Sequence, residues 1–487
     1  MNTQEKQMAI DSLKDYEMRL IELADQIWEV AEPAFEEFQS AEAICDFLES
    51  AGFFVERGIA GLPTAFKGTF GSGHPVIGIL GEYDALIDLS QEAGCPVHHP
   101  TGGRCGHGCG HHELAASTLA GALIAKKYLE ENLVQGTIVY FGCPAEEGGA
   151  GKAFMVRAGV FRGVDIALSS HPAGSNAVRT GTTCASLRFE YTFHGIKSHP
   201  ATQPENGRSA FDALELFNIG INFLREHIKQ QNYIHYAVTY AGGDAPNVIP
   251  DLAKGVYVVR STSLEEAREL SCRMDLCAQG AAISTETTYE KSLLSAGNHL
   301  ISCESVERIL YKNFEETDLP IYTEEDEKFG RKIFESNPKF ADAPDICCQF
   351  GRVWESEFRQ WQDTHQETVF NRFLPSYAHT QDLVAGATDL AEVSWNLPTA
   401  SIFFVTAPKK VSVHTWQFTA FGKTDCAHQG ILMAGRVLGG TAIDFFADPA
   451  LVEEAWKDFR KNLPGEYISP VEGMVVEKFH ENRQNNI

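Results

Sequence analysis

Residues 105–113 read CGHGCGHHE and place two cysteines, three histidines and a glutamate close together. Thiolate and imidazole are natural ligands for zinc and similar divalent ions. In Cys109-Gly110-His111 the glycine lets the backbone turn, so that both side chains can face one ion. Two ligands do not make a site, however. The tripeptide alone is therefore as compatible with a glycine-rich loop as with a metal site.

Two adjacent carboxylates, Glu146 and Glu147, lie in the segment PAEEGG, directly after an apolar run. Close carboxylates repel each other unless a cation or a shared proton compensates. One of the pair could coordinate a metal ion while its neighbour takes a proton from water. A solvated surface pair is the usual fate of Glu-Glu, but the preceding strand and the flanking glycines favour a pocket.

Two distant histidines, His171 and His414, each follow a segment that is predicted to form a strand. Taken singly, each is more typical of a surface histidine than of a metal ligand. With the residues above they complete a set of five candidate ligands: Cys109, His111, Glu147, His171 and His414. Five ligands suit two metal ions that share a bridging group.

Several other polar residues lie near these candidates in the sequence. In GEYDAL (81–86), Asp84 could orient a ligand histidine or solvate the strand end, and Glu82 lies beside the same pocket. His107 is a further candidate ligand, and His112 could cap or line the start of the following helix. The histidines of VHHP (97–100) are expected in a loop near the mouth of the site.

The elements that must position these residues follow an alternating pattern. Apolar runs at 75–81, 136–142 and 164–170 predict buried strands, and 114–132 predicts a helix between the first two. Strands that alternate with helices indicate an α/β fold with a mainly parallel sheet flanked by helices. Open sheets of this kind bind ligands beyond the carboxyl ends of their strands, which is where the polar clusters fall.

The N-terminal region predicts two helices. Apolar residues spaced along 13–30 form one face of a helix that stops before Pro33, and Ser40 could cap a second helix that ends at Gly52. Near the other end of the chain, SIFFVTA (401–407) reads as one more buried strand.

The pattern changes near residue 186, where half-exposed strands replace buried ones. The expected order from there is β-α-β-β-α-β, which is ferredoxin-like. Its elements are strands at 186–195, 235–243, 253–261 and 285–293 and helices at 207–229 and 263–281. We therefore expect a domain inserted at 186–296 into a larger one made of 1–185 and 297–487.

The inserted segment has its own polar residues, His199, Asn247 and Arg260. Core packing explains none of the three, whereas surface exposure explains all of them equally well. The fork of Arg260 suits a carboxylate, and His199 could donate a hydrogen bond to a developing oxyanion.

The bulk composition is that of a globular chain of 487 residues in two or three domains. Its net charge of −26 and the lack of Lys/Arg clusters disfavour nucleic acid and anionic membranes as partners. The charged N-terminus does not resemble a signal peptide, and no stretch approaches the roughly 18 apolar residues of a membrane span. Twelve cysteines without a disulfide framework are expected to be mostly free thiols of a cytoplasmic protein.

The motifs GEYDAL, GHGCGHH, CPAEEGG, SSHP, HGIKSHP, GGDAPNVIPD, TDLAEVSW and HTWQ occur in this order over nearly the whole chain. The sequence thereby resembles the aminoacylase/glutamate-carboxypeptidase superfamily of two-metal amidohydrolases. It is most similar to the branch of p-aminobenzoyl-glutamate hydrolase B subunits. HTWQ together with GEYDAL and CPAEEGG is quite specific to that branch.

The resemblance implies a role for each candidate. Cys109 would bridge two divalent ions, zinc or manganese, and Glu146 would be the general base. His199 would aid the oxyanion in the active site of a partner subunit, while Asn247 and Arg260 hold the substrate carboxylate. The inserted domain would be a lid and dimerisation surface, in a homodimer or with a related subunit.

One position departs from the family pattern. After Cys-Gly-His the family usually has Asp or Asn, whereas this chain has His112. A bulkier side chain that can itself bind metal puts the geometry of the adjacent ligands and the metal preference in question. It removes none of the expected ligands.

The sequence therefore predicts a metal-dependent hydrolase that cleaves the amide bond of an N-acyl or N-aroyl amino acid, foremost p-aminobenzoyl-glutamate or a similar folate-breakdown conjugate. Three alternatives stay open. They are a dipeptidase or aminoacylase of the same superfamily, a substrate-binding partner subunit, and a cysteine amidase that uses Cys109 with His111. The last is disfavoured because a nucleophile and its base usually come from separate segments.

Overall fold

The computed structural model describes residues 3–337, 339, 354–366, 368–384 and 386–474. The chain forms two compact units. Unit 1 consists of Met1–Thr182, Ile301–Val384 and Glu392–Tyr467, and unit 2 consists of Thr183–Leu300, Ala385–Ala391 and Ile468–Ile487. All of the predicted insertion, 186–296, thus lies in unit 2.

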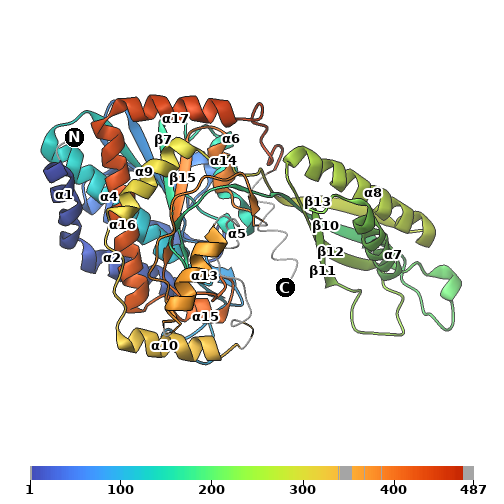
Figure 1. The fold of residues 1–487 in the computed structure, drawn as a ribbon. Helices are drawn as coiled ribbons and strands as arrows, with labels where there is room; N and C mark the ends of the chain where they lie inside the picture. The colour runs from blue at the N-terminus through green and yellow to red at the C-terminus, as the bar shows by residue number, and fades with distance from the viewer. Residues whose placement is uncertain (1–2, 338, 340–353, 367, 385, 475–487) are drawn as a thin grey trace. The chain divides into compact units, whose positions relative to one another are not determined.

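A seven-stranded sheet forms the centre of unit 1 (Figure 1). Its four central strands run parallel, and antiparallel strands pair at both edges. In spatial order the strands are β1 (Phe54–Arg57), β2 (Phe66–Ser72), β6 (Gly136–Gly142), β3 (Val76–Gly81), β7 (Ile166–Ala173), β15 (Thr399–Val405) and β8 (Ala177–Val178). The predicted α/β fold with a mainly parallel sheet is confirmed.

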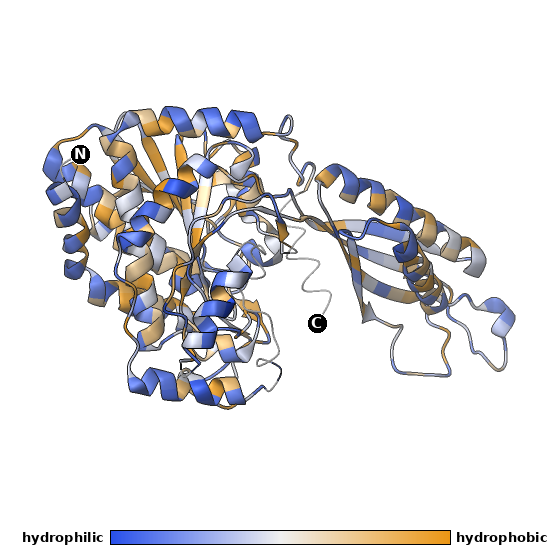
Figure 2. Cartoon of the chain, viewed as in Figure 1, coloured by the Kyte–Doolittle hydropathy of each residue, from blue (hydrophilic) through white to orange (hydrophobic). Residues whose placement is uncertain are grey.

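Helix α4 (His111–Asn132) packs across β3, β6 and β7 and also against α16 (Asp425–Ala447). Both helices are buried along most of their length because they are apolar on nearly every side. The strands beneath them are strongly hydrophobic in Figure 2, whereas α10 (Glu324–Glu335) and α17 (Pro449–Asn462) present mixed faces. The core beneath α4 fixes the position of the helix start, where the cysteine–histidine cluster lies.

Further elements complete unit 1. The helices are α1 (Thr3–Asp11), α2 (Glu17–Val30), α3 (Phe38–Ser50), α6 (Gly151–Arg157), α9 (Glu304–Glu315) and α13 (Glu355–Thr364). Its short elements are β4 (Leu86–Ile87), β5 (Cys105–Gly106), β14 (Leu383–Val384), α5 (Glu146–Gly149) and α15 (Trp416–Thr419). Two more, β9 (Thr182–Thr183) and α14 (Leu390–Ser394), cross the boundary between the two units.

Both predicted N-terminal helices form, and the first stops before Pro33, but two details of where they begin differ from the prediction. The helix expected over 13–30 is interrupted, because the backbone N–H of Tyr16 donates to Leu13 in a tighter turn before α2 begins. Ser40 does not cap α3 but lies inside it. The carboxylate of Glu32 instead accepts hydrogen bonds from the backbone N–H groups of Gln39 and Ser40, 3.0 and 2.9 Å away.

Unit 2 is a four-stranded antiparallel sheet with two helices. Its elements are β10 (Ala185–His194), α7 (Ala210–Leu224), β11 (Tyr233–Tyr240), β12 (Leu252–Ser261), α8 (Leu264–Thr285) and β13 (Thr288–Gly297). The chain order β-α-β-β-α-β and the strand order β11-β12-β10-β13 are ferredoxin-like, as predicted. Alternate residues of β10 and β12 face a core of their own beneath α7 and α8.

The expectation that no stretch approaches a membrane span needs correction. Helix α16 is long and apolar enough by length and composition, but 83% of its apolar window is buried inside the fold. Its hydrophobicity therefore serves packing against α4 and the sheet. No disulfide joins the cysteines that the structure describes, and Cys347 and Cys348 lie outside the described residues.

Candidate metal centre

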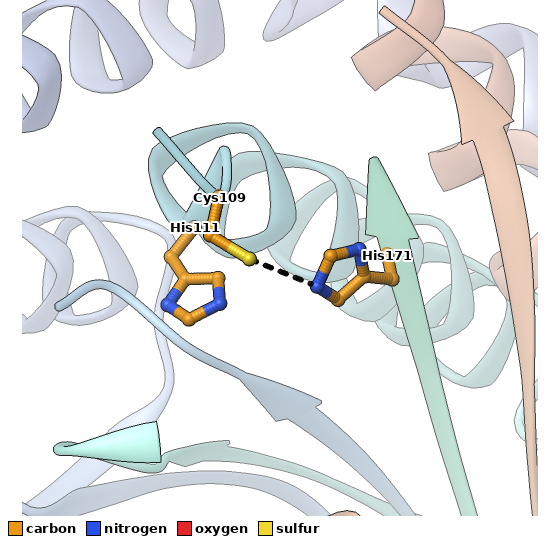
Figure 3. Close-up of side chains that lie close together, drawn as sticks. All are labelled: Cys109, His111 and His171. Atoms are coloured by element: carbon orange, nitrogen blue, oxygen red, sulfur yellow. Dashed lines mark hydrogen bonds between the residues drawn. The ribbon is translucent and has the colours of Figure 1, made fainter. Parts of the chain in front are cut away.

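The predicted ligands of unit 1 meet beyond the carboxyl ends of the parallel strands. His171 lies on β7, where its partner in β15 is Phe403, and Cys109 and His111 lie at the start of α4. The Sγ atom of Cys109 is 3.5 Å from Nε2 of His171, and Figure 3 shows both side chains pointing toward each other. Residues 62 positions apart in the sequence thus face one another.

Gly110 makes the turn between Cys109 and His111 possible. Its backbone is left-handed, with φ of 75°, and a Cβ atom there would lie 2.5 Å from Cγ of Pro172. Glycine alone avoids both the strain and the clash. This close approach of the α4 start to the end of β7 is what brings Cys109 and His171 together.

The hydrogen bonds of the two histidines fix their tautomers. Nδ1 of His171 lies 2.8 Å from the carbonyl oxygen of Pro172, which only accepts, so Nδ1 carries the proton and Nε2 presents a lone pair toward Cys109. Nδ1 of His111 donates in the same way to Oδ1 of Asp84 at 2.8 Å. A carboxylate behind a ligand histidine is the arrangement that orients such rings in metal sites.

Asp84 also positions the acidic turn. Its second oxygen, Oδ2, accepts a 2.8 Å hydrogen bond from the backbone N–H of Glu147. A second buried carboxylate, Glu37, accepts a 2.8 Å hydrogen bond from the backbone N–H of Ala145, whose φ of 61° is left-handed. The strained turn that carries Glu146 is therefore held by one carboxylate on each side.

His414 reaches the same place from the segment after β15. Its Nε2 atom lies 3.0 Å from Oε1 of Glu147, and its backbone N–H donates a 2.7 Å hydrogen bond to the carbonyl of Gly108. The second bond ties the His414 segment directly to the cysteine–histidine loop. About half of the His414 side chain is exposed, so this edge of the cluster is open to solvent.

These donors form overlapping groups whose ligand atoms lie within 4.8 Å of one another. One group is Cys109, His111 and His171, and a second is Cys109, Glu147 and His414. Cys109 belongs to both, which is the position that a ligand bridging two ions would occupy. A third group adds carboxylates around His111 and consists of Glu82, His111 and Glu146.

The donor set fits divalent metal ions. Sulfur, imidazole nitrogen and carboxylate oxygen together suit zinc and also accommodate manganese. Within the part of the chain that the structure describes, Nε2 of His111 is buried and makes no hydrogen bond, although Oε2 of Glu82 lies 3.4 Å away. A buried polar atom is costly when unsatisfied, so a cation at this point would complete it.

The pKa values of the cluster also favour a bound cation. Burial, reinforced by the charge of Glu147, raises the pKa of the Cys109 thiol well above its ordinary value. Burial also lowers the pKa of His171 to about 4, with the charge of His111 acting in the same direction. Burial opposes ionisation of Glu147 as well, but His414 and His111 lower its pKa to about 2. A dication would supply the charge that lets Cys109 coordinate as a thiolate.

A buried lysine lies behind this site. Nζ of Lys152 donates a 2.5 Å hydrogen bond to Oε1 of Glu82, whose other oxygen lies 3.4 Å from Nε2 of His111. Lys152 is fully buried and Glu82 nearly so. Sequence reasoning found Glu82 but missed Lys152, whose only signal is a charge in a largely apolar segment, and Glu37, which belongs to a glutamate pair typical of exposed surface.

His107 and His112 are buried but are held elsewhere. Nε2 of His107 lies 3.0 Å from the carbonyl of Ile27, and Nε2 of His112 lies 2.9 Å from the carbonyl of Gly422. The residue at the unusual position after Cys-Gly-His therefore anchors the α4 start to the segment before α16. Neither histidine belongs to the groups of converging ligand atoms described above.

The three candidates from the inserted segment lie in unit 2. His199 is exposed, and its Nδ1 accepts hydrogen bonds from the backbone N–H groups of Ala201 and Thr202 at 3.2 Å. Asn247 is exposed in the loop between β11 and β12. Arg260 is half-buried on β12 and pairs in register with Ser186 of β10.

The sequence from residue 78 to residue 417 matches peptidase family M20/M25/M40. The chain belongs to this family. Over 457 residues it is 38% identical to the B subunit of p-aminobenzoyl-glutamate hydrolase from Escherichia coli (strain K12), covering 93% of this chain and 94% of that protein. Over 234 residues it is 29% identical to the A subunit of the hydrolase from the same organism, covering 46% and 52%.

Solved structures agree on the fold. A Bacillus subtilis protein described as a dinuclear metal binding peptidase from the M20 family superposes with a TM-score of 0.56 at 19% identity. The match covers 89% of this chain and 99% of that one. The family resemblance, the α/β fold class and the prediction of a metal-dependent hydrolase acting on amide bonds are thereby confirmed.

Proposed function

We propose that this member of the M20/M25/M40 family hydrolyses the amide bond of an N-acyl or N-aroyl amino acid, with p-aminobenzoyl-glutamate or a similar folate-breakdown conjugate as substrate. The observation that carries the proposal is the convergence of five metal-type ligands beside the carboxylate of Glu146. The similarity of nearly the whole chain to the B subunit of p-aminobenzoyl-glutamate hydrolase supports the choice of substrate class.

Two divalent ions, zinc or manganese, would be held by Cys109, His111, Glu147, His171 and His414. When bound, such ions polarise the substrate carbonyl and lower the pKa of the hydrolytic water. Asp84 then has two tasks, since it fixes the ring of His111 and the backbone of Glu147 at once. The buried Glu82–Lys152 pair limits how far His111 can shift.

Glu146 would act as the general base. It accepts a proton from the attacking water and delivers it to the leaving nitrogen of the amide. Its position on the one-turn element α5, next to the ligand Glu147, supports this role. So does its membership of the group with Glu82 and His111. Because Glu37 and Asp84 bind the backbone on both sides of Glu146, the carboxylate of Glu146 is held in position before substrate binds.

Unit 2 would supply substrate recognition. Arg260 and Asn247 would bind the carboxylate of the substrate's amino-acid part, and His199 would donate to the developing oxyanion in the site of a partner chain. The exposure of His199 and Asn247 supports a role in binding something outside their own unit. We further propose that unit 2 acts as a lid and dimerisation domain.

The partner would be a second copy of this chain or a related subunit. The detectable similarity to both the A and the B subunits of p-aminobenzoyl-glutamate hydrolase supports a heteromer of related chains. The free thiols among the described cysteines support a reducing, cytoplasmic setting.

The test is hydrolysis of p-aminobenzoyl-glutamate and a panel of N-acyl amino acids and dipeptides by the purified chain, alone and with a related subunit. We expect p-aminobenzoyl-glutamate or another N-aroyl amino acid to give the highest kcat/KM, with metal content measured on the same sample. Preference for dipeptides would instead favour the dipeptidase alternative. Activity that needs a second subunit, with substrate binding but no turnover by this chain, would make it a binding partner.

A further inference from the structure

A second set of metal-type donors lies outside the centre described above. Glu92, Cys95 and His99 belong to one loop of unit 1, and their ligand atoms lie within 4.8 Å of one another. The side chains of Glu92 and His99 are largely exposed, and Cys95 is a half-buried free thiol. None of the three belongs to the groups of ligand atoms around Cys109 and His111, so the function proposed above does not account for them.

The backbone of this loop brings the three donors to one point. The N–H of Glu92 donates a 3.0 Å hydrogen bond to the carbonyl of His99, which places the first and last donors opposite each other. The N–H of Cys95 bonds back to the carbonyl of Glu92 at 3.4 Å, so the thiol turns toward the same end. The spacing is Glu-x2-Cys-x3-His, and short spacings of this kind are common in zinc sites.

A buried amide makes the loop rigid. Gln91 lies almost wholly inside it, where its Nε2 donates a 2.9 Å hydrogen bond to the carbonyl of Val97 and its Oε1 accepts one of 2.9 Å from the N–H of His99. A loop braced across its middle by a side chain holds its donors in place without a metal. Such preorganisation lowers the entropy cost of binding an ion.

A simple surface ion pair does not account for the thiol. Nδ1 of His99 lies 2.6 Å from Oε2 of Glu92, which a solvated pair at the surface would also show. That pair does not require a cysteine beside it. The combination of sulfur, nitrogen and carboxylate oxygen is the donor set of zinc, whereas a cation such as magnesium prefers oxygen alone.

We propose that Glu92, Cys95 and His99 bind one zinc-type divalent ion, with water completing its coordination. The loop also contacts the segment that carries His414, since the N–H of Gly94 donates a 2.9 Å hydrogen bond to the carbonyl of Ala420. The ring of His98 lies 5.6 Å from that of Trp416, two residues after His414. The bound ion would therefore stabilise this loop at the place where the loop packs against the 414–420 segment.

Alkylation of individual cysteines, read by mass spectrometry of peptides from the full-length protein, tests this site directly. The metal-free protein is treated with iodoacetamide with and without zinc, and the rate at Cys95 is compared with that at Cys272, an exposed free cysteine in unit 2. A thiolate that coordinates zinc is not free to react. When the free zinc concentration is about ten times the dissociation constant of the site, alkylation of Cys95 should be about tenfold slower, and the alkylation rate of Cys272 should be unchanged.

Four variants make the test specific. His99→Asn and Glu92→Gln change exposed side chains, and both should remove most of the protection of Cys95 by zinc. Cys95→Ser should bind one zinc fewer per chain than the wild type, whereas Cys272→Ser should bind the same number. Protection of Cys109 is read from its own peptide, so failure of the catalytic centre to bind metal is seen separately.

Two outcomes would overturn the proposal. Equal alkylation of Cys95 with and without zinc would overturn the proposal and leave a surface ion pair beside an unrelated thiol. Protection of Cys95 that persists in His99→Asn would overturn it as well, because the thiol would then bind zinc alone. Circular dichroism of the variants confirms that the loop changes have not unfolded unit 1.

Discussion

Lys152 and Glu82 form a buried ion pair in unit 1, with Nζ 2.5 Å from Oε1, and the other oxygen of Glu82 lies 3.4 Å from Nε2 of His111. The charge on Glu82 would be costly at this depth without a partner. With the lysine in place, a carboxylate can stand beside His111 and contribute negative charge to the metal centre. The pair thus links the stability of the fold to the properties of the site.

Replacing Lys152 with Met is expected to destabilise unit 1 strongly. The substitution keeps the length of the side chain but leaves Glu82 buried and unpaired, which costs about 3–5 kcal/mol in comparable cases. Thermal and urea denaturation measure the loss. Adding Glu82→Gln to Lys152→Met should recover part of it, because the uncompensated charge is then gone.

The matched control is Lys127→Met. Lys127 pairs with Glu131 one helical turn away at 2.8 Å, but both side chains are more than a third exposed. Exposed pairs of this type contribute about 0.3–0.5 kcal/mol, so the control should unfold nearly as the wild type does. Equal stability of the two lysine variants would show that the Lys152–Glu82 pair does not stabilise the fold.

Replacing Asp84 with Asn is expected to weaken metal binding. Asp84 accepts from both His111 and the backbone of Glu147, and an amide has only one oxygen to offer. Loss of a carboxylate behind a ligand histidine typically lowers metal affinity by about 10- to 100-fold. Competition of the metal-free protein against a fluorescent zinc chelator measures this directly.

Asp25→Asn serves as the control for Asp84→Asn. Asp25 contacts Nε2 of His428 at 2.9 Å, a comparable Asp–His pair whose residues are outside the metal cluster. It should leave zinc affinity unchanged. A tenfold loss in both variants would mean that any disturbed Asp–His pair has this effect, and Asp84 would lose its special role.

Much of this arrangement was predictable because buried strands and metal ligands have strong local signatures. The apolar run at 136–142 coincides with β6, and the motif Cys-Gly-His supplies two candidate ligands by residue type, although it did not by itself distinguish a metal site from a glycine-rich loop. His171 and His414 are less obvious, because each is a single histidine whose significance depends on a neighbour brought close by the fold. Only their placement after strands indicated a shared pocket.

The residues that sequence reasoning missed act through distant contacts. Glu37 is one of two adjacent glutamates after a helix, which reads as solvated surface, yet its carboxylate is buried against the turn at Ala145. Lys152 stands in a short helix whose other buried residues are apolar. Such partners become visible only once the sheet has brought their segments together, since no periodic pattern marks them.

The stability of unit 2 should depend on pH through Glu266. Burial disfavours its charged form, but Lys229, Asn232 and hydroxyl groups near the start of α8 bind the carboxylate and lower its pKa to about 2. A depressed folded-state pKa contributes stability above the unfolded pKa of about 4.3, and that contribution is lost as pH falls toward 2. Glu266→Gln should therefore destabilise unit 2 by roughly 1–3 kcal/mol at pH 7 and by roughly half as much near pH 3.

The matched control for this pH dependence is Glu265→Gln on the same helix, an exposed neighbour. Its effect should be small at both pH values. Hydrogen exchange of the α8 and β12 amides reports on unit 2 without interference from unit 1. A Glu266→Gln effect that is the same size at pH 7 and pH 3 would show that packing, and not the charge, is responsible.

Removal of metal is expected to abolish hydrolysis. Dialysis against EDTA should eliminate activity, and zinc or manganese should restore it. An amidase that used Cys109 as its nucleophile would instead survive EDTA and be inactivated by alkylation alone. Restoration by metal after Cys109 has been alkylated would contradict the assignment of this thiol as a ligand.

Glu146→Gln is expected to keep the metal and lose most of the turnover. The amide is nearly isosteric and retains its place on α5, where Glu37 and Asp84 bind the backbone on either side. It cannot accept the proton of the attacking water, and general acid–base catalysis contributes about 10²- to 10⁴-fold to the rate.

The neighbouring change Glu147→Gln should have the opposite effect. It should lower the metal content more than it lowers kcat per bound metal. Measuring kcat and metal stoichiometry on the same preparations separates the two roles. Turnover of Glu146→Gln within a few fold of the wild type would remove this residue from the mechanism.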